Sequence, residues 1–445
     1  MSGLVKFPGI AAILIVFFLA SVFSLSAQAD GTGLRASSEA GRSRGDYLTL
    51  KIAVMGPGDE LYFWWGHIAL IVEDAVSGQS RFYDYGLFSF KNERFFVNFA
   101  LGRLLYSCGV SSAAGNINNY IRTNRDVTIY TLDLSAKQKE AVWSFAEQNV
   151  LPENRDYYYH HFKDNCATRI RDLIDLATEG QFKERFVQSP GRFTLRQHVR
   201  RHTWFSPFFD WLLNFLMGQN IDTPITEWEE MFLPAEIGNR IQNFQYVDPS
   251  GEKRALVAST EILYRAVNRP AILDKPRRQW IRELFLGLFI AAGLVFLLWL
   301  RGLKSPVPAA QGRFLLGLTQ SLLGLFFGIA GTILFFMSFF TNHDYTYHNS
   351  NILYVNPLIL AAVPLGIKAA WGKDQKKRLF SEWLLRGLWT YVFLGGILSM
   401  VIKLFPEFYQ QNQVTQALVL PFALVLSFIP SWGKILLAGF RKKWG

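Results

Sequence analysis

The chain has 445 residues, of which half are hydrophobic and 16% are aromatic. This composition is too apolar for an ordinary soluble protein and too polar for a protein that lies wholly within a membrane, so we expect a mixed architecture of two or more domains. The formal net charge is +11. Because much of it lies beside hydrophobic segments, and no basic stripe interleaved with aromatic residues or zinc-finger spacing occurs, we expect no nucleic-acid partner.

The N-terminal segment is typical of an exported protein. Residues 1–29 combine a basic Lys6, an apolar stretch and small residues at the end, which is the pattern of a secretory signal peptide. An uncleaved N-terminal anchor is the alternative, and both would export the following chain. Residues 30–46 are rich in Gly, Ser and charge, so we expect a flexible leader there.

Residues 47–245 are predicted to form an outer domain in which strands come first and helices follow. Residues 47–54 alternate apolar and polar side chains, and 67–73 and 81–85 flank a Ser-Gly turn, which predicts a hairpin. Residues 135–149 and 166–177 have helical spacing. A short aromatic helix is expected within 205–217. It is too short to span a bilayer and belongs either to the core or to the membrane interface.

Residues 246–282 are expected to be a juxtamembrane connector, and 283–445 a bundle of about five membrane helices. The third segment contains Pro357 and Pro364, so we expect it to be kinked or broken. The segments that are long and apolar enough to span are 283–300, 314–340, 352–372, 384–404 and 416–437.

The charges in the loops predict the orientation of this bundle. With the outer domain outside the cytoplasm, the cytoplasmic loops and the tail are basic, whereas the external loops 341–351 and 405–415 contain no Lys or Arg. One group of basic residues opposes this positive-inside rule, and we expect it to bind anionic headgroups on the outer side. It consists of Lys275, Arg277, Arg278 and Arg282, just before the first span.

The sequence contains two cysteines, Cys108 and Cys166. One disulfide is possible in an exported protein, but the position of Cys166 favours a working thiol. Cys166 opens a predicted helix, where the positive end of the dipole and unpaired backbone N–H groups favour the thiolate. The same N–H groups can stabilise an oxyanion. A buried, inert cysteine is the alternative.

A base for this thiol is available at the start of an apolar strand. His67 follows Trp64-Trp65-Gly66 there, and a neutral imidazole in a partly apolar wall can accept the proton of Cys166, although a lone strand histidine is often structural. Asp84 on the probable partner strand can fix the tautomer of His67, with Tyr83 or Tyr85 as alternatives because the register is not determined. His160 and His161 are a further possible base.

No sequence motif in the chain indicates a cofactor. HExxH spacing, a P-loop, a dinucleotide fingerprint and a Gly-x-Ser-x-Gly elbow do not occur, so we expect neither cofactor nor metal, and a site built from His67, His160 or His161 with an acid is a weaker alternative. The external loop 342–351 holds two histidines, His343 and His348. It is either a polar loop in a belt of tyrosines or a site for a lipid headgroup.

Several motifs, taken together in this order, resemble the Lnb N-terminal periplasmic domain family over about residues 47–245. The stretch from His348 to Leu358 is similar to the membrane part of its longer members. The order of His before Cys also resembles circularly permuted papain-like folds, including the lecithin:retinol acyltransferase and NlpC/P60 groups, which implies an α+β outer domain. The motifs are Gly56-Pro57-Gly58-Asp59-Glu60-Leu61, Trp65-Gly66-His67, Tyr83-Asp84-Tyr85-Gly86, Pro152-Glu153-Asn154-Arg155, Asn165-Cys166-Ala167-Thr168-Arg169 and Met231-Phe232-Leu233-Pro234.

Members of that family are implicated in bacterial lipoprotein N-acylation, so the resemblance implies a multi-pass protein of the bacterial inner membrane, with the outer domain periplasmic and the C-terminus cytoplasmic. It implies a Cys166 nucleophile, a His67 base and Asp84 near the third polar position, which is a histidine in some permuted relatives. Many relatives also have an acidic or aromatic residue where this chain has His160-His161.

The implied reaction moves an acyl group from a phospholipid through a Cys166 thioester to the N-terminal amine of a diacylated lipoprotein. A cell-wall amidase or peptidase of the NlpC/P60 type and a non-catalytic membrane scaffold are the alternatives, and the sequence assigns no oligomeric state. The residues expected to contact substrate are Trp65, Tyr85, Asn165, Arg169, His343, His348 and Asn349.

Overall fold

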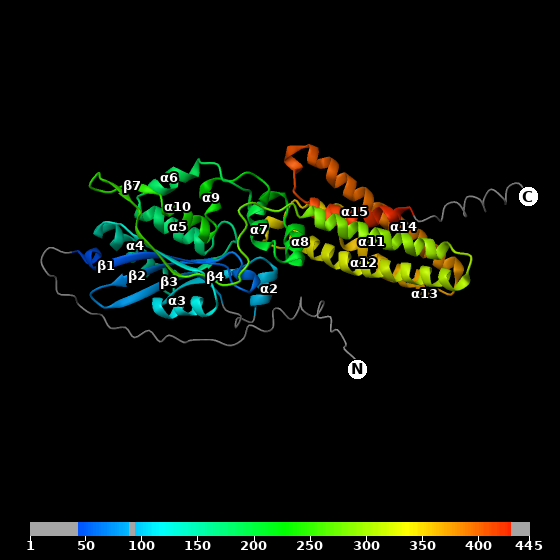
Figure 1. Ribbon diagram of the computed structural model, residues 1–445, viewed down its shortest axis with the longest axis horizontal. Helices are drawn as coiled ribbons and strands as arrows, with labels where there is room; N and C mark the ends of the chain where they lie inside the picture. Colours follow the sequence, from blue (N-terminus) through cyan, green and yellow to red (C-terminus); the bar gives the residue numbers. More distant parts are fainter. Residues whose placement is uncertain (1–42, 89–93, 429–445) are drawn as a thin grey trace, which may run out of the picture.

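A sheet-and-helix domain and a helical bundle lie end to end in the computed structural model, which describes residues 43–88 and 94–428 (Figure 1). The predicted signal peptide and the leader as far as residue 42 lie outside the described residues, as does the chain beyond residue 428.

The outer domain is built on a seven-stranded sheet in the order β6-β4-β3-β2-β1-β5-β9, with every neighbouring pair antiparallel. The predicted first strand and the hairpin are confirmed as β1, β2 and β3. The strands are β1 Leu48–Met55, β2 His67–Asp74, β3 Gln79–Leu87, β4 Leu105–Ser112, β5 Val127–Leu132, β6 Asp156–Tyr158 and β9 Val257–Tyr264, with β7 Gln245–Val247 and β8 Lys253–Ala255 as a separate pair.

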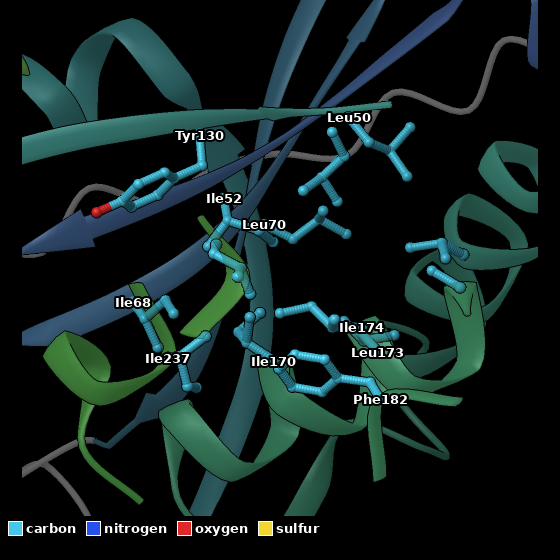
Figure 2. Packing of buried hydrophobic residues seen from close by; sticks show 14 of the residues in the cluster. Leu50, Ile52, Ile68, Leu70, Tyr130, Ile170, Leu173, Ile174, Phe182 and Ile237 are labelled. Atoms are coloured by element: carbon cyan, nitrogen blue, oxygen red, sulfur yellow. The ribbon is translucent and has the colours of Figure 1, made fainter. Parts of the chain in front are cut away.

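Helices cover both faces of this sheet, as the alternation of its side chains requires. Leu50, Ile52 and Leu70 pack against α5, Cys166–Ala177, as Figure 2 shows, whereas Ala53 and Ile71 belong to the core shared with α3, Ala113–Arg122. Complete burial of each large aliphatic side chain contributes roughly 1.5–3 kcal/mol. The remaining helices of the domain are α2 Phe95–Ala100, α4 Ala136–Asn149, α6 Gln181–Val187, α7 Leu195–Thr203, α8 Pro207–Leu216, α9 Glu227–Glu230 and α10 Pro234–Ile241.

The segment expected to be a connector contributes to the outer domain instead. Residues 246–282 include β9, which pairs with β5 and forms one edge of the sheet. Most side chains of β9 are exposed, so the strand lacks the apolar alternation that would have revealed it in the sequence. The sheet domain therefore extends past residue 245 to Tyr264.

As far as residue 428, the bundle contains four segments long and apolar enough to cross a membrane by length and composition. The third, residues 350–371, begins as two 3-10 turns around Pro357 before α13, so the predicted break is confirmed. The described part of the predicted fifth span is α15, a 15-residue apolar helix containing Pro421. The helices are α11 Trp280–Gly302, α12 Pro306–Phe340, α13 Ala362–Trp371, α14 Gln375–Val401 and α15 Gln413–Ser427.

Both loops that were expected to be external contact the sheet domain. In the loop after α12, the backbone N–H of Asn342 donates to the carbonyl of Leu101 at 2.8 Å. In the loop before α15, the carbonyl of Gln411 accepts from Nη2 of Arg200 at 3.2 Å. The short aromatic helix predicted within 205–217 is α8, which packs against the bundle through Trp211. These contacts place both loops on the side of the outer domain.

Candidate active site

His67 and Asp84 meet on neighbouring strands near the end of the sheet. The antiparallel register pairs Ala69 with Asp84, and Nε2 of His67 lies 2.6 Å from Oδ1 of Asp84. Because an ionised carboxylate only accepts hydrogen bonds, Nε2 carries the hydrogen. Nδ1 of His67 has no hydrogen-bond partner in the described part of the chain and is therefore the nitrogen available to a reacting group.

Gly86 brings Cys166 to the same place. Continuing the register of β2 and β3 by two residues sets His67 opposite Gly86, which has a left-handed φ of 93° at a bulge. A Cβ added to Gly86 would lie 4.0 Å from Cβ of Cys166. Cys166 at the N-terminus of α5 therefore lies within van der Waals distance of the place that a side chain of residue 86 would take, at the end of the sheet where His67 and Asp84 lie.

The electrostatics of His67 favour its charged form. Burial by itself lowers the pKa of His67, but Tyr120, Asp84 and Cys166 act in the opposite direction and together raise it well above its ordinary value of 6.5. A histidine held as an imidazolium beside a cysteine is the arrangement that stabilises a thiolate. The three predicted catalytic residues are thus brought into one electrostatic cluster.

Asn165 organises the first turn of α5 and is not exposed to a substrate. Its Oδ1 accepts hydrogen bonds from the N–H groups of Ala167 and Thr168, and its Nδ2 donates to the carbonyls of His161 and Phe232. The predicted substrate contact is a buried helix cap, a role that asparagine fills well. The backbone N–H of Cys166 itself has no acceptor among the described residues and is free for an oxyanion.

Two residues of this cluster were missed by the sequence analysis. Tyr120 of α3 stacks on His67 with ring centroids 6.1 Å apart. The guanidinium of Arg125 lies over the ring of Tyr120 and donates to the carbonyl of Gly56 at 2.9 Å. The available signal was that Gly56 opens the Gly-Pro-Gly motif, but its partner is 69 residues away and no local pattern connects them.

Three other residues of the sheet domain were predicted to contact substrate, and each packs against other side chains of the protein. Trp65 packs against the small core beneath α7 and α8, and Tyr85 is buried in the main core. Arg169 binds Asp164 through two hydrogen bonds of 2.6 and 2.7 Å, and its guanidinium lies 4.3 Å from the ring centroid of Tyr157. The polar groups of Tyr85 and Arg169 are therefore engaged within the outer domain.

The predicted residues of the external loop serve mainly to join the bundle to the outer domain. Nε2 of His343 lies 3.0 Å from the carbonyl oxygen of Phe99, and Nδ2 of Asn349 donates to the carbonyl of Phe215 at 2.8 Å. His348 is exposed, with a left-handed φ of 52°. Only His348 of the three therefore has an exposed side chain.

The alternative bases, His160 and His161, differ in their environments. Nδ1 of His160 accepts from two backbone N–H groups, so its Nε2 donates to Asp344 at 2.7 Å and both ring nitrogens are occupied. Burial, together with His160 and His343, lowers the pKa of His161 to about 4, which keeps it neutral. His160 thus links the outer domain to the external loop, and no base role is available to it without breaking that link.

The second cysteine does not pair with the first. Both thiols are free, so the disulfide considered from the sequence is absent. Burial raises the pKa of Cys108 to about 12, which makes it a poor nucleophile at neutral pH. Within residues 43–88 and 94–428, no group of three or more His, Cys, Asp or Glu side chains is placed to hold a metal ion.

The sheet domain and the apolar helices define a multi-pass membrane protein whose N-terminal domain is of a periplasmic type. Residues 40–201 match the family model described as the Lnb N-terminal periplasmic domain, and residues 309–430 match the Lnb transmembrane domain. The chain belongs to the Lnb family, a family of membrane proteins that are lipoprotein N-acyltransferase-like. No curated protein and no solved structure matches the chain.

Proposed function

We propose that this protein is a lipoprotein N-acyltransferase of the bacterial inner membrane, with its C-terminus in the cytoplasm, and that Cys166 carries the acyl group as a thioester. The observation that supports this most directly is the hydrogen bond of 2.6 Å between His67 and Asp84. It leaves Nδ1 of His67 free beside a cysteine that begins a helix. We propose further that the outer domain is a circularly permuted papain-like fold.

In the first half of the reaction, the Cys166 thiolate attacks the carbonyl carbon of a phospholipid ester. The carbonyl π electrons move to the oxygen, and the N–H of Cys166 is placed to stabilise the resulting negative charge. When the tetrahedral intermediate collapses, the C–O bond breaks. The leaving alkoxide takes the proton of the His67 imidazolium, which releases a lysophospholipid and leaves the acyl group on sulfur.

In the second half, the free α-amine of a diacylated lipoprotein attacks the thioester carbonyl. His67, now neutral, accepts the proton that the amine loses as the C–N bond forms. The C–S bond then breaks and the electron pair returns to sulfur, which restores the thiolate. Asp84 holds the imidazole in place through both halves and is not itself protonated.

Attachment to the membrane suits this reaction, because both substrates carry acyl chains that keep them in the bilayer. Confining and orienting two reactants replaces much of the entropy cost of a bimolecular encounter. The external loops that contact the outer domain support this proposal, because they fix the orientation of the domain relative to the bundle.

The deciding experiment is mass spectrometry of the purified full-length protein after incubation with phospholipid vesicles and no acceptor. We expect an acyl adduct on Cys166 that hydroxylamine removes, and no adduct on Cys108. Addition of a diacylated lipopeptide should then discharge the adduct and yield the N-acylated product. Absence of the adduct at every phospholipid concentration, with the thiol of Cys166 intact, would contradict the thioester mechanism.

The same residues would also suit a cell-wall amidase, and the acceptor distinguishes the two. An amidase would cleave a peptidoglycan fragment with the phospholipid withheld, whereas the acyltransferase proposed here requires an acyl donor. A non-catalytic scaffold would show neither activity, and Cys166→Ala would leave its behaviour unchanged.

A further inference from the structure

The hydroxyl of Tyr157 is buried and has no hydrogen-bond partner among the described residues. Tyr157 lies in the short edge strand β6, where it pairs with Tyr106 of β4. Leaving a buried polar group unpaired costs about 1–3 kcal/mol. A phenylalanine would fill the same space without this cost, so the structure alone gives no reason for the hydroxyl.

The position of the hydroxyl supplies a reason. The Tyr157 oxygen and Cβ of Cys166 each lie 4.0 Å from the point that a Cβ on Gly86 would occupy. Cε2 of Tyr159 lies 3.7 Å from the same point. The hydroxyl therefore borders the same space beside Cys166 that the glycine leaves open, at the residue that the strand register sets opposite His67.

The first turn of α5 supplies only one of the donors that an oxyanion site needs. Asn165 occupies the N–H groups of Ala167 and Thr168, which leaves the N–H of Cys166 free. Oxyanion sites in acyl-transfer enzymes are built from several convergent donors that are fixed before the charge appears. A second donor must come from a neighbouring element, and β6 is the element whose unpaired hydroxyl reaches this space.

The surroundings of Tyr157 keep its hydroxyl both protonated and in place. Burial and the neighbouring Cys166 raise the pKa of Tyr157, so the group holds its hydrogen at neutral pH. The guanidinium of Arg169 lies 4.3 Å from the ring centroid and is itself fixed by two hydrogen bonds to Asp164. A cation held over an aromatic face attracts the ring and restrains its position.

We propose that Tyr157 is a catalytic residue whose hydroxyl donates a hydrogen bond to the carbonyl oxygen attacked by Cys166. The proton stays on Tyr157 throughout, and the bond strengthens as negative charge develops opposite the N–H of Cys166. This inference rests on the proposed function, because it assigns the second donor of the same acyl-transfer site.

The test uses the full-length protein in vesicles and the variant Tyr157→Phe, with Tyr158→Phe as the matched control. Tyr158 is the next residue of β6 but is 70% exposed. At saturating phospholipid, we expect Tyr157→Phe to form the Cys166 acyl adduct roughly 100- to 1,000-fold more slowly, which is the usual effect of losing one oxyanion donor. Tyr158→Phe should react at the wild-type rate.

A second readout separates this role from a structural one and from activation of the thiol. Alkylation of Cys166 by iodoacetamide forms no oxyanion, so Tyr157→Phe should leave its rate and pH dependence unchanged. The melting temperature should not fall, because the variant removes an unpaired polar group. If alkylation of Tyr157→Phe slows in parallel with its acylation, the hydroxyl activates the Cys166 thiolate, and the proposed role is overturned.

The remaining outcomes separate this inference from the proposed function. If wild type and Tyr157→Phe form the adduct equally fast, the oxyanion role is wrong while the acyltransferase proposal stands. If wild type forms no adduct with phospholipid, the proposed function fails. Wild type and Tyr157→Phe are then compared with a p-nitrophenyl ester as acyl donor. Equal rates of Cys166 acylation by this ester would overturn the role of Tyr157 as well.

Discussion

Two buried polar sites of the outer domain, the carboxylate of Glu230 and the surroundings of Cys166, differ in how completely their hydrogen bonds are made. In the ion cluster between α7, α9 and α10, Glu230 alone accepts from the N–H groups of Arg192 and Phe193, from His198 at 2.9 Å and from Arg240 at 2.5 Å. Around Cys166, Nδ1 of His67, the N–H of Cys166 and the hydroxyl of Tyr157 have no partner in the described chain.

The contrast separates groups that stabilise the fold from groups that are available to bind a substrate. A buried carboxylate is tolerated only when its partners are present, so Glu230 with its four donors is a structural element. Unpaired donors and acceptors that converge on one point are instead a cost to stability, and binding a reacting group offsets that cost. Changes in the ion cluster should therefore affect stability, and changes around Cys166 should affect activity.

The largest effect is expected from Cys166→Ala, which removes the nucleophile. We expect N-acylation of a diacylated lipopeptide by the full-length protein in vesicles to fall by at least about 10⁴-fold, the usual loss when a covalent nucleophile is removed. The melting temperature should stay close to that of the wild type. The control is Cys108→Ala, measured in the same assay. Retained activity in Cys166→Ala with loss in Cys108→Ala would reverse the assignment.

Glu230→Gln should lower the free energy of unfolding of the outer domain by about 3–5 kcal/mol, because it removes the buried negative charge that accepts from the guanidinium of Arg240 and from three further donors. Denaturant unfolding followed by tryptophan fluorescence measures the change, and Glu252→Gln, whose side chain is 72% exposed, is the control. Equal stability of the two variants would show that the ion cluster contributes little.

Glu230 also predicts how stability depends on pH. Burial raises the pKa of Glu230. The interactions with His198, the hydrogen bond from the N–H of Phe193 and the charge of Arg240 outweigh burial and lower the pKa from 4.5 to about 2. Because the folded value lies below the unfolded one, this contribution is complete above pH 4.5 and is lost as the pH falls towards 2. Glu230→Gln should flatten the stability curve in that range.

Asp84→Asn should reduce the acylation rate roughly 100-fold, since the imidazole loses the group that orients it and favours its charged form. Asp84 is one of the groups that raise the pKa of His67. The imidazolium of the variant should therefore lose its proton at a lower pH than in wild type. The alkaline limb of the rate of Cys166 acylation should shift to lower pH, and an unshifted limb would exclude Asp84 as the partner of His67 in catalysis.

Gly86→Ala is expected to have the smallest effect on activity, about 10-fold, by placing a methyl group between Cys166 and Tyr159. Gly78→Ala is the matched control, because Gly78 also has a positive φ, of 68°, but a Cβ there would meet nothing within 4 Å. Both variants should lose about 1 kcal/mol of stability from backbone strain. Equal activity in the two would show that the space beside Gly86 is not used.

The sequence predicts those parts of this molecule that depend on local patterns. α5 begins and ends at the predicted residues, because the capping Asn165 and the apolar spacing from Ile170 to Ala177 lie within one short segment. The hairpin of β2 and β3 is equally local. Its register, which selects Asp84 over Tyr83 and Tyr85 as the hydrogen-bond partner of His67, required the structure.

The sequence fails where the decisive contact is distant or the pattern is short. Asn165 was expected to bind substrate, but the carbonyl of Phe232, 67 residues away, turns its side chain into the core. Tyr157 stands in a run of three tyrosines whose inward and outward alternation becomes visible only once β6 is paired with β4. β9 carries mostly exposed side chains and gives no periodic signal.

The length of α12 has a mechanical consequence. With 35 residues it extends about 50 Å at 1.5 Å per residue, whereas the hydrocarbon of a bilayer is about 30 Å thick. The loop at its C-terminal end is bonded to the sheet domain through Asn342 and Asp344. α12 therefore acts as a rigid spacer, and each added or removed turn would change the distance from its N-terminal end to the sheet domain by about 5.4 Å.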